Sequence, residues 1–261
     1  MFSDQEIKAY ERDGLACLRQ VIDKSWIEKL AKASQDVRQA PSSGSRQFGD
    51  QQGKFFIDRF LWTFNEVFKD FAFNSPLPRI AAEFMRSKSV FLMADIIFTK
   101  DPNSSQITPW HHDQPYGWYD GSQLCQFWIP LDKVDLGSGA LELVRGSHRW
   151  GKWFNVVDFK AQKDETQDLD KMPDIEADRS QFDIVHYDME PGDCILFSEL
   201  TVHSSPANRS PRPRHGLALH YAGDDSRYVM RSYTRKPPYD PGIKPGDAFG
   251  CELFPKVWQA A

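Results

Sequence analysis

The run VFLMADIIF, residues 90–98, is where the sequence changes from helical patterns to strand-forming ones. Its β-branched and aromatic residues are typical of a buried strand. Similar runs follow, separated by turn sequences such as PGD at 191–193 and LGSGA at 136–140. The further expected strands are QFWIPL (126–131), ALELV (140–144), FDIVHYDM (182–189), CILFSEL (194–200) and HGLALHYA (215–222).

The residues before this run have helical periodicity. Ser25 and Glu28 have the spacing of a capping box, which predicts a helix over residues 25–39. A second helix is expected between Pro76 and Arg86. Strands that follow a helical layer without alternating helices predict an antiparallel double-stranded β-helix, a jelly-roll or cupin-like core.

The length of 261 residues suits one large β domain, so we expect a single domain over residues 1–261. Two of its segments lack strand periodicity: a long charged segment, which we interpret as a possible lid, and a proline-rich tail, which we expect to wrap over the surface. The expected parts are a helical layer (1–87), a jelly-roll core (88–222) containing the possible lid (151–181), and an extended tail (223–261).

The composition limits the classes of molecule that the protein could bind. The net charge is −5 and the 32 Lys and Arg residues are scattered, which argues against nucleic acid or a membrane and favours a small-molecule substrate. No apolar run approaches the roughly 20 residues that span a bilayer. Four widely spaced cysteines are typical of reduced thiols, so we expect a cytoplasmic protein. No feature of the sequence fixes an oligomeric state.

The stretch WHHDQPYGWYDG, residues 110–121, contains a candidate metal site. On a strand, His111 and Asp113 would point to the same side, as two ligands of a two-histidine, one-carboxylate iron site. His186 and Asp188 have the same spacing. We favour the first pair because aromatic residues flank it on both sides, as in a cavity wall.

A second histidine ligand must come from a later strand, and His203, His215 and His220 are the candidates. His203 ends a strand-like run and could reach the interior of the barrel. Arg214 opens the next run, and an antiparallel return would bring it close to Ser205. An arginine there could bind a carboxylate through two parallel hydrogen bonds.

With these residues the chain resembles the phytanoyl-CoA dioxygenase family of Fe(II)- and 2-oxoglutarate-dependent oxygenases. The resemblance covers roughly residues 88–222. It rests on TPWHHDQPY (108–116), WIPLDKVDLGSGALELVRGSHRWG (128–151), EPGDCILFSELTVHSSPANRS (190–210) and RHGLALHY (214–221), which occur in the family's order.

The resemblance implies an oxygenase that hydroxylates a small molecule with Fe(II), O2 and 2-oxoglutarate, releasing succinate and CO2, with ascorbate helpful in vitro. It implies that iron binds His111, Asp113 and His203, and that these residues are catalytic. Because Asp113 is present, hydroxylation is favoured over halogenation, although desaturation, epoxidation or ring formation can occur at such a site. The implied 2-oxoglutarate contacts are Arg214, Ser205, Trp128, Met93 and, more weakly, His112 and Lys100.

His112 departs from the family pattern, which often has glutamine at this position. Strand alternation predicts that its side chain points away from the metal. Two alternatives stay open for the whole chain: a cupin-like metal-binding or sensing module without turnover, and an iron dioxygenase that does not use 2-oxoglutarate. The substrate is not identified by the sequence, and no basic surface indicates an acyl-CoA.

Overall fold

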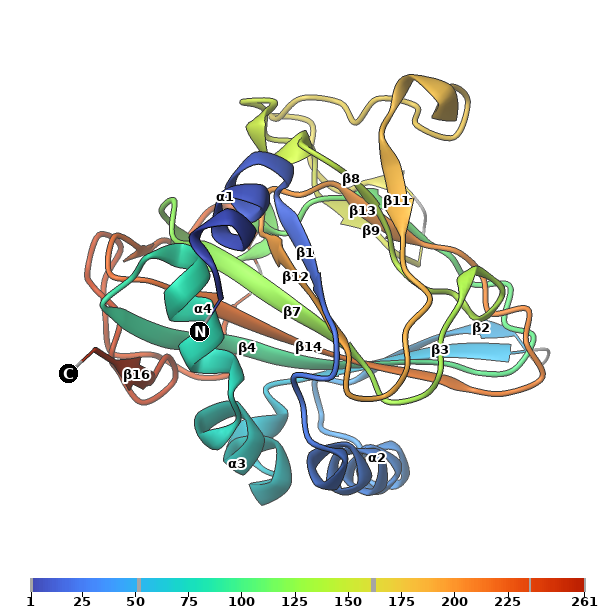
Figure 1. Ribbon diagram of the computed structural model, residues 1–261, viewed down its shortest axis with the longest axis horizontal. Coiled ribbons are helices and arrows are strands. Elements are labelled where there is room, and N and C mark those ends of the chain that lie inside the picture. Colours follow the sequence, from blue (N-terminus) through green and yellow to red (C-terminus); the bar gives the residue numbers. More distant parts are fainter. Residues whose placement is uncertain (1, 51–52, 161–162, 235, 261) are drawn as a thin grey trace.

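The structure is a computed structural model that describes residues 2–50, 53–160, 163–234 and 236–260. Two antiparallel sheets face each other, and helices cover the outer face of the larger one (Figure 1). This arrangement confirms the predicted fold class, a jelly-roll core with N-terminal helices. The expected single domain over 1–261 stays a prediction.

The larger sheet has the strand order β1-β12-β7-β14-β4-β3-β2, and β16 pairs with one end of β4. The smaller sheet has the order β11-β8-β13-β5. The strands of the larger sheet are β1 (Leu15–Leu18), β2 (Arg46–Asp50), β3 (Gly53–Arg59), β4 (Ser89–Lys100), β7 (Leu124–Pro130), β12 (Cys194–Ser198), β14 (Arg214–Ala222) and β16 (Lys256–Gln259). Those of the smaller sheet are β5 (Thr108–His111), β8 (Glu142–Val144), β11 (Ile184–His186) and β13 (His203–Ser205). Two short ribbons pair β6 (Tyr119–Asp120) with β15 (Arg227–Tyr228), and β9 (Val157–Asp158) with β10 (Lys163–Asp164).

Four helices and five 3-10 turns complete the described elements. The helices are α1 (Asp4–Asp13), α2 (Lys24–Gln39), α3 (Glu66–Asn74) and α4 (Leu77–Met85). The turns are η1 (Leu61–Thr63), η2 (Gln114–Tyr116), η3 (Leu136–Ser138), η4 (Ser147–Arg149) and η5 (Arg179–Gln181). No helix in the described ranges is long and apolar enough to cross a membrane.

Strand alternation on β14 separates the hydrophobic core from the interior between the sheets. Leu217 and Tyr221 face the helices and share a core with Leu30 of α2 and Phe71 of α3. The residues between them, at even positions, face the smaller sheet. The larger sheet therefore buries one face under helices and offers the other to a site.

The predicted helices are present, but the capping box at Ser25 is wrong. Helix α2 begins at Lys24, so Ser25 lies inside its first turn and Asp23 occupies the N-cap position. The capping box that the structure contains joins Ser3 and Glu6 at the start of α1. In both places the serine and the glutamate are three residues apart, so this spacing alone did not distinguish them.

The helical layer and the tail are less uniform than predicted. The strands β1, β2 and β3 all come from residues 1–87 and form the two edges of the larger sheet. Residues 223–261 include β16, which pairs with β4. These strands have four to seven residues, too few to display a period against the neighbouring sequence. Residues 235 and 261 of the tail lie outside the described residues.

Candidate active site

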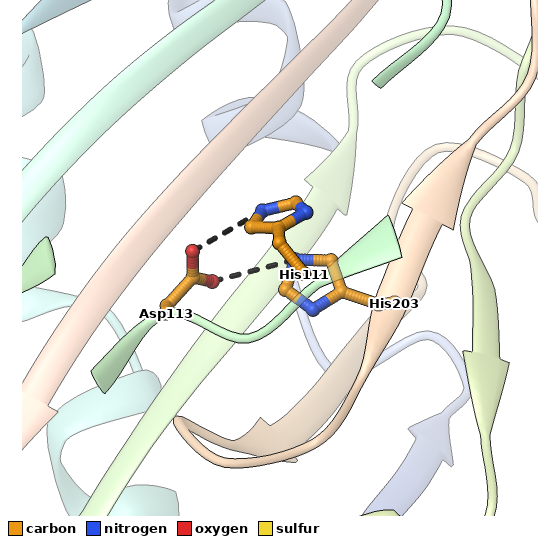
Figure 2. Close-up of side chains that lie close together, drawn as sticks. All are labelled: His111, Asp113 and His203. Carbon is orange, nitrogen blue, oxygen red and sulfur yellow. Dashed lines mark ion pairs between the residues drawn. The ribbon is translucent and has the colours of Figure 1, made fainter. Parts of the chain in front are cut away.

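Two histidines and one aspartate meet between the sheets (Figure 2). β5 ends at His111, and β13 begins at His203, directly opposite it in the antiparallel register. Asp113 follows β5 and points back at both rings: its carboxylate oxygens lie 3.3 Å from Nε2 of His111 and 3.3 Å from Nε2 of His203. One potential ligand atom from each residue lies within 4.8 Å of the other two, as a single bound ion requires.

Backbone carbonyls fix the orientation of both rings. Nδ1 of His111 lies 2.8 Å from the carbonyl oxygen of Pro109, and Nδ1 of His203 lies 2.9 Å from that of Thr201. A nitrogen that donates to a carbonyl carries the ring proton, which leaves Nε2 as the lone-pair atom. Both Nε2 atoms are the ones that face Asp113, so the rings are prepared to bind a metal.

The protonation of the three groups also suits a metal. Burial alone would raise the pKa of Asp113, but its electrostatic interaction with His203 and its hydrogen bond with His111 hold that pKa well below its ordinary value. Burial, with the neighbouring His111, lowers the pKa of His203 to about 4. A carboxylate and a neutral imidazole are the forms that coordinate metal ions. The side-chain amide of Gln126 donates a hydrogen bond to Asp113 and holds the carboxylate in place.

The three residues line a cavity that extends along β14 between the sheets. Its walls are mainly aromatic and include Phe98, Trp118, Trp128 and Phe159. Apolar walls with a few convergent polar groups are typical of small-molecule sites.

Two buried basic residues lie at one end of the cavity. Arg214, only 2% exposed, donates from Nη2 to Oγ of Ser205 at 3.1 Å, and its guanidinium lies 5.5 Å from the ring centre of Trp128. Nε of Arg214 is buried and has no hydrogen-bond partner among the described residues. Burial lowers the pKa of Arg214 to about 10.

Lys100 is the second basic residue, and it is buried, so the alternative interpretation of this residue as a surface lysine is wrong. Lys100 is opposite Arg214 in the register of β4 and β14, and it is fully buried. Its Nζ donates to both Ser205 oxygens at 3.0 Å and to the carbonyl of Pro206 at 2.6 Å. No carboxylate forms an ion pair with either residue within the described ranges. Arg214 therefore brings a buried guanidinium to one end of the cavity without a direct carboxylate partner among the described residues. Behind Ser205, burial and the neighbouring Arg214 lower the pKa of Lys100 well below its ordinary value.

Arg214 and Ser205 meet for a different reason than the sequence suggested. They were expected on neighbouring strands of one sheet. Instead, β13 and β14 belong to facing sheets, and the strand-like run that ends at His203 is broken after Ser198. The loop between β13 and β14 thus crosses from one sheet to the other, and Ser205 faces Arg214 across the interior.

Two of the predicted co-substrate residues do not line the cavity. Met93 is fully buried in the core beneath the helices, because the residues of β4 that face the cavity are Ala94, Ile96 and Phe98. His112 points away from the metal residues, as strand alternation predicted. Its Nε2 accepts a hydrogen bond from the backbone N–H of Phe154 at 3.0 Å.

The alternative metal ligands are also placed elsewhere. His186 is exposed on β11, the edge strand of the smaller sheet. His215 faces outward on β14 and pairs with Asp132 at 2.8 Å. His220, the third candidate for the distal ligand, does line the cavity but does not belong to the group of three.

Glu199 is a buried residue beside the cavity to which the sequence analysis assigned no role, and it contacts the cavity-lining Tyr119. The carboxylate of Glu199 binds Nδ1 of His220 at 2.8 Å and accepts from the hydroxyl of Tyr119 at 2.9 Å. Its backbone carbonyl accepts from the N–H of Asp113 at 2.9 Å. His220 is an even number of residues from Arg214, so strand alternation places both side chains on the same face of β14. Glu199 lies in a turn, where no sequence pattern predicts which way a side chain points.

The segment 151–181 covers the metal residues from one side. Phe159 lines the cavity and contacts His111 edge-on, with ring centres 4.8 Å apart. The backbone N–H of Val157 donates to the hydroxyl of Tyr116 at 2.6 Å. Residues 161–162 lie outside the described residues. The position fits a lid, and its opening stays a prediction.

Comparison with known proteins identifies the family. Residues 10–216 match the family model for phytanoyl-CoA dioxygenase (PhyH). The chain is 29% identical over 153 residues to a probable phytanoyl-CoA dioxygenase of Caenorhabditis elegans, covering 54% of this chain and 46% of that protein. It is 24% identical over 255 residues to peroxisomal phytanoyl-CoA dioxygenase of Rattus norvegicus, covering 88% of this chain and 71% of the relative. The match thus spans about half of the worm protein's length.

Solved structures share the fold over nearly the whole chain. The epimerase SnoN, crystallised with Fe3+, alpha ketoglutarate and nogalamycin RO, superposes with a TM-score of 0.79 at 19% identity and 98% coverage of both chains. EctD from S. alaskensis, with 2-oxoglutarate and 5-hydroxyectoine, gives 0.70 at 18% identity, with 90% of this chain and 82% of that chain covered. Together with the family match over residues 10–216, these findings show that the chain belongs to the phytanoyl-CoA dioxygenase family.

Proposed function

We propose that this protein is an Fe(II)- and 2-oxoglutarate-dependent dioxygenase that hydroxylates a small molecule. The observation that carries the proposal is the pairing of the His111, Asp113 and His203 group with the buried Arg214 end of the same cavity. A metal site alone would fit many functions. A metal site with a buried arginine that has no ion-pair partner in the described part of the chain fits a metal and an acidic co-substrate.

The donor set fits iron. Two imidazole nitrogens and one carboxylate are the ligands of non-haem Fe(II) oxygenases, which leave further coordination positions open. Bound there with 2-oxoglutarate and O2, iron would supply the oxidising power for hydroxylation, with succinate and CO2 as co-products. The chain's own part is to hold the three ligands in their coordinating forms and to surround them with aromatic side chains that exclude water.

The other end of the cavity fits a carboxylate. The buried Nε of Arg214 has no partner in the described part of the chain, and Nε and Nη2 form one side of the planar guanidinium fork. The hydroxyl of Ser205 lies beside that fork. The amine of Lys100 donates a hydrogen bond to the Ser205 hydroxyl and so fixes its position. We therefore assign Arg214 and Ser205 to direct contact with the co-substrate carboxylate, Trp128 to the wall beside it, and Lys100 to support of Ser205.

The primary substrate is expected to be a small molecule, since the cavity between the sheets has mainly apolar walls with a few polar groups. We also place the protein in the cytoplasm, because its four cysteines are all unpaired thiols. Hydroxylation is the preferred outcome since Asp113 occupies the third ligand position.

The test is to incubate the Fe(II)-loaded protein with 2-oxoglutarate, O2, ascorbate and a metabolite library. We expect succinate formation, with a product that has gained one oxygen atom, about 16 mass units. Oxidation of a library member without 2-oxoglutarate would instead support a dioxygenase that does not use this co-substrate. Metal binding without 2-oxoglutarate binding would support the metal-binding or sensing module.

A further inference from the structure

A buried histidine–glutamate pair lies at the cavity wall, and its two side chains have no role in the proposed metal or co-substrate sites. Glu199 is 1% exposed and His220 6% exposed, with 2.8 Å between the carboxylate and Nδ1. The hydroxyl of Tyr119 donates to the other carboxylate oxygen at 2.9 Å. Both oxygens of Glu199 are thus bonded, and the imidazole is held in one orientation.

The pair lies far from the Arg214 end of the cavity. His220 is six residues beyond Arg214 on β14, so both side chains face the interior at a separation of roughly 20 Å along the strand. The residues between them on this face are small. A Cβ at Gly216 would lie 2.8 Å from the Trp128 ring, and Ala218 lines the cavity floor. The cavity wall between the Arg214 guanidinium and the His220 imidazole is therefore formed by small residues of β14.

Nε2 of His220 is the polar atom that this arrangement offers to the cavity. No hydrogen bond joins it to another of the described residues, while Nδ1 is bound to Glu199. The neighbouring walls are aromatic, with Phe60 and Trp118 at this end, and Arg59 lines the same region. Gln126 and Tyr119 line the cavity as well. A few oriented polar groups in a mainly apolar wall fix how a ligand lies. Burying an ion-paired group there is costly, and apolar side chains would fill the same space at lower cost.

We propose that Nε2 of His220 hydrogen-bonds a hydroxyl group of the primary substrate, which is therefore a predominantly apolar small molecule carrying a hydroxyl. A hydroxyl can both donate and accept, so it pairs with the imidazole in either protonation state. The inference rests on the proposed function in that the cavity is the substrate site. Glu199 is then a positioning residue, since it orients the ring.

The test compares isosteric probes on the Zn(II)- and 2-oxoglutarate-loaded protein, using ligand-detected NMR titrations. The probe pairs are cyclohexanol with methylcyclohexane, and phenol with toluene. We expect each alcohol to bind about 5-fold more tightly than its hydrocarbon partner, the effect of one net hydrogen bond. His220→Leu should remove this preference. His215→Gln, on the outer face of the same strand, should keep it.

Two further measurements keep the outcomes decisive. If His220→Leu does not fold because Glu199 is left buried alone, the double variant E199Q/H220F removes the charge and fills the volume, and it should also lose the preference. Titrations without Zn(II) and 2-oxoglutarate test the inference separately from the proposed function, because the folded chain positions His220 and Glu199 without either ligand. An equal affinity for alcohol and hydrocarbon in the unchanged protein would overturn the inference, as would a preference that survives in both variants. If 2-oxoglutarate does not bind but the alcohol preference depends on His220, the proposed function fails and the hydroxyl site stands.

Discussion

At the scale of single residues, Arg214 has the most specific assignment. Replacing it with alanine should raise the 2-oxoglutarate concentration needed for half-maximal succinate formation by about 10- to 100-fold, because a charge-assisted hydrogen bond is worth about 1.5–3 kcal/mol. Arg214→Lys should recover little, since an ammonium lacks the planar fork. Steady-state kinetics at varied 2-oxoglutarate would measure both.

The matched control for Arg214 is Lys54→Ala, because Lys54 is an exposed cation on β3 next to cavity-lining Phe55. Its 2-oxoglutarate dependence should equal that of the unchanged protein. Unaltered kinetics in Arg214→Ala would remove this residue from the co-substrate site.

Asp113 is the residue on which the metal assignment depends. Asp113→Ala should lower Mn(II) affinity by at least about 100-fold, since it leaves two neutral imidazoles without the anionic ligand. Isothermal titration with Mn(II), in place of the air-sensitive Fe(II), measures this. The chain supplies its own control in His186 and Asp188, which have the same spacing but lie away from the cavity. If their double alanine variant lost the metal and Asp113→Ala kept it, the assignment would be reversed.

Asp95 gives a prediction for stability instead of activity. It is 1% exposed, accepts from the backbone N–H of Trp62 at 3.0 Å, and its Oδ1 has no partner in the described ranges. Burial raises its pKa to about 7. The folded protein therefore holds a proton that the unfolded chain, with a pKa near 3.8, releases. This contribution is fully present below pH 4 and is lost as the pH rises through 7.

Because the Asp95 contribution is lost as the pH rises, the unfolding free energy should fall by about 3 kcal/mol between pH 5 and pH 8, at about 1.4 kcal/mol per pKa unit. Asp95→Asn keeps an acceptor for Trp62 and cannot ionise, so its stability should vary less over this range. Urea unfolding at both pH values would show it. An equal pH dependence in the two proteins would mean that Asp95 is ionised when folded.

The sequence predicted the residues of the metal site better than those around them. His111 and Asp113 could be named from their spacing, and the family resemblance implied His203 as their partner. Ser205 and Arg214 were expected close together, but they meet across the facing sheets and not on neighbouring strands. The remaining residues depend on contacts between distant segments. A lysine at the end of a strand has the same local appearance whether the sheet opposite covers it or solvent does.

At the scale of elements, short edge strands were the features that the sequence did not reveal. The long central strands β4, β7 and β14 were predicted within two residues of their ends, because each has seven or more residues of strong strand character. β1, β3 and β16 are defined by pairing with a partner far along the chain. Their existence follows from the assembled sheet and not from their own sequence.

The segment 151–181 is held to the core through His112, which gives a prediction at this scale. His112→Leu removes the acceptor of the buried Phe154 N–H and leaves that donor unsatisfied, a cost of about 1–3 kcal/mol. We expect faster amide hydrogen exchange at residues 153–157. Mn(II) affinity should stay within about 3-fold, because the ring points away from the metal residues. Unchanged exchange across this segment would show that His112 does not anchor it.

At the scale of the whole molecule, the site joins the two facing sheets, which also share a buried apolar cluster that includes Trp128, Leu143 and Phe197. The smaller sheet carries His111 and His203, and the larger sheet carries Arg214 and Lys100. A metal and a co-substrate that contact both sheets would add bonds across the interior. They bind the folded chain and not the unfolded one, so their binding must raise the stability of the whole fold.

Loading the protein with Mn(II) and 2-oxoglutarate should therefore raise its melting temperature, and removal of the metal with EDTA should reverse the change. At about 100 times the dissociation constant, one ligand adds about 2.7 kcal/mol to the unfolding free energy. Differential scanning calorimetry would separate the contributions. Arg214→Ala should keep the shift from Mn(II) and lose most of the increment from 2-oxoglutarate, whereas Asp113→Ala should lose the shift from Mn(II). If 2-oxoglutarate added the same increment in the unchanged protein, in Arg214→Ala and in Asp113→Ala, its binding site would lie outside the cavity. Binding inside the cavity depends on Arg214 and on the metal, so both substitutions must reduce the increment.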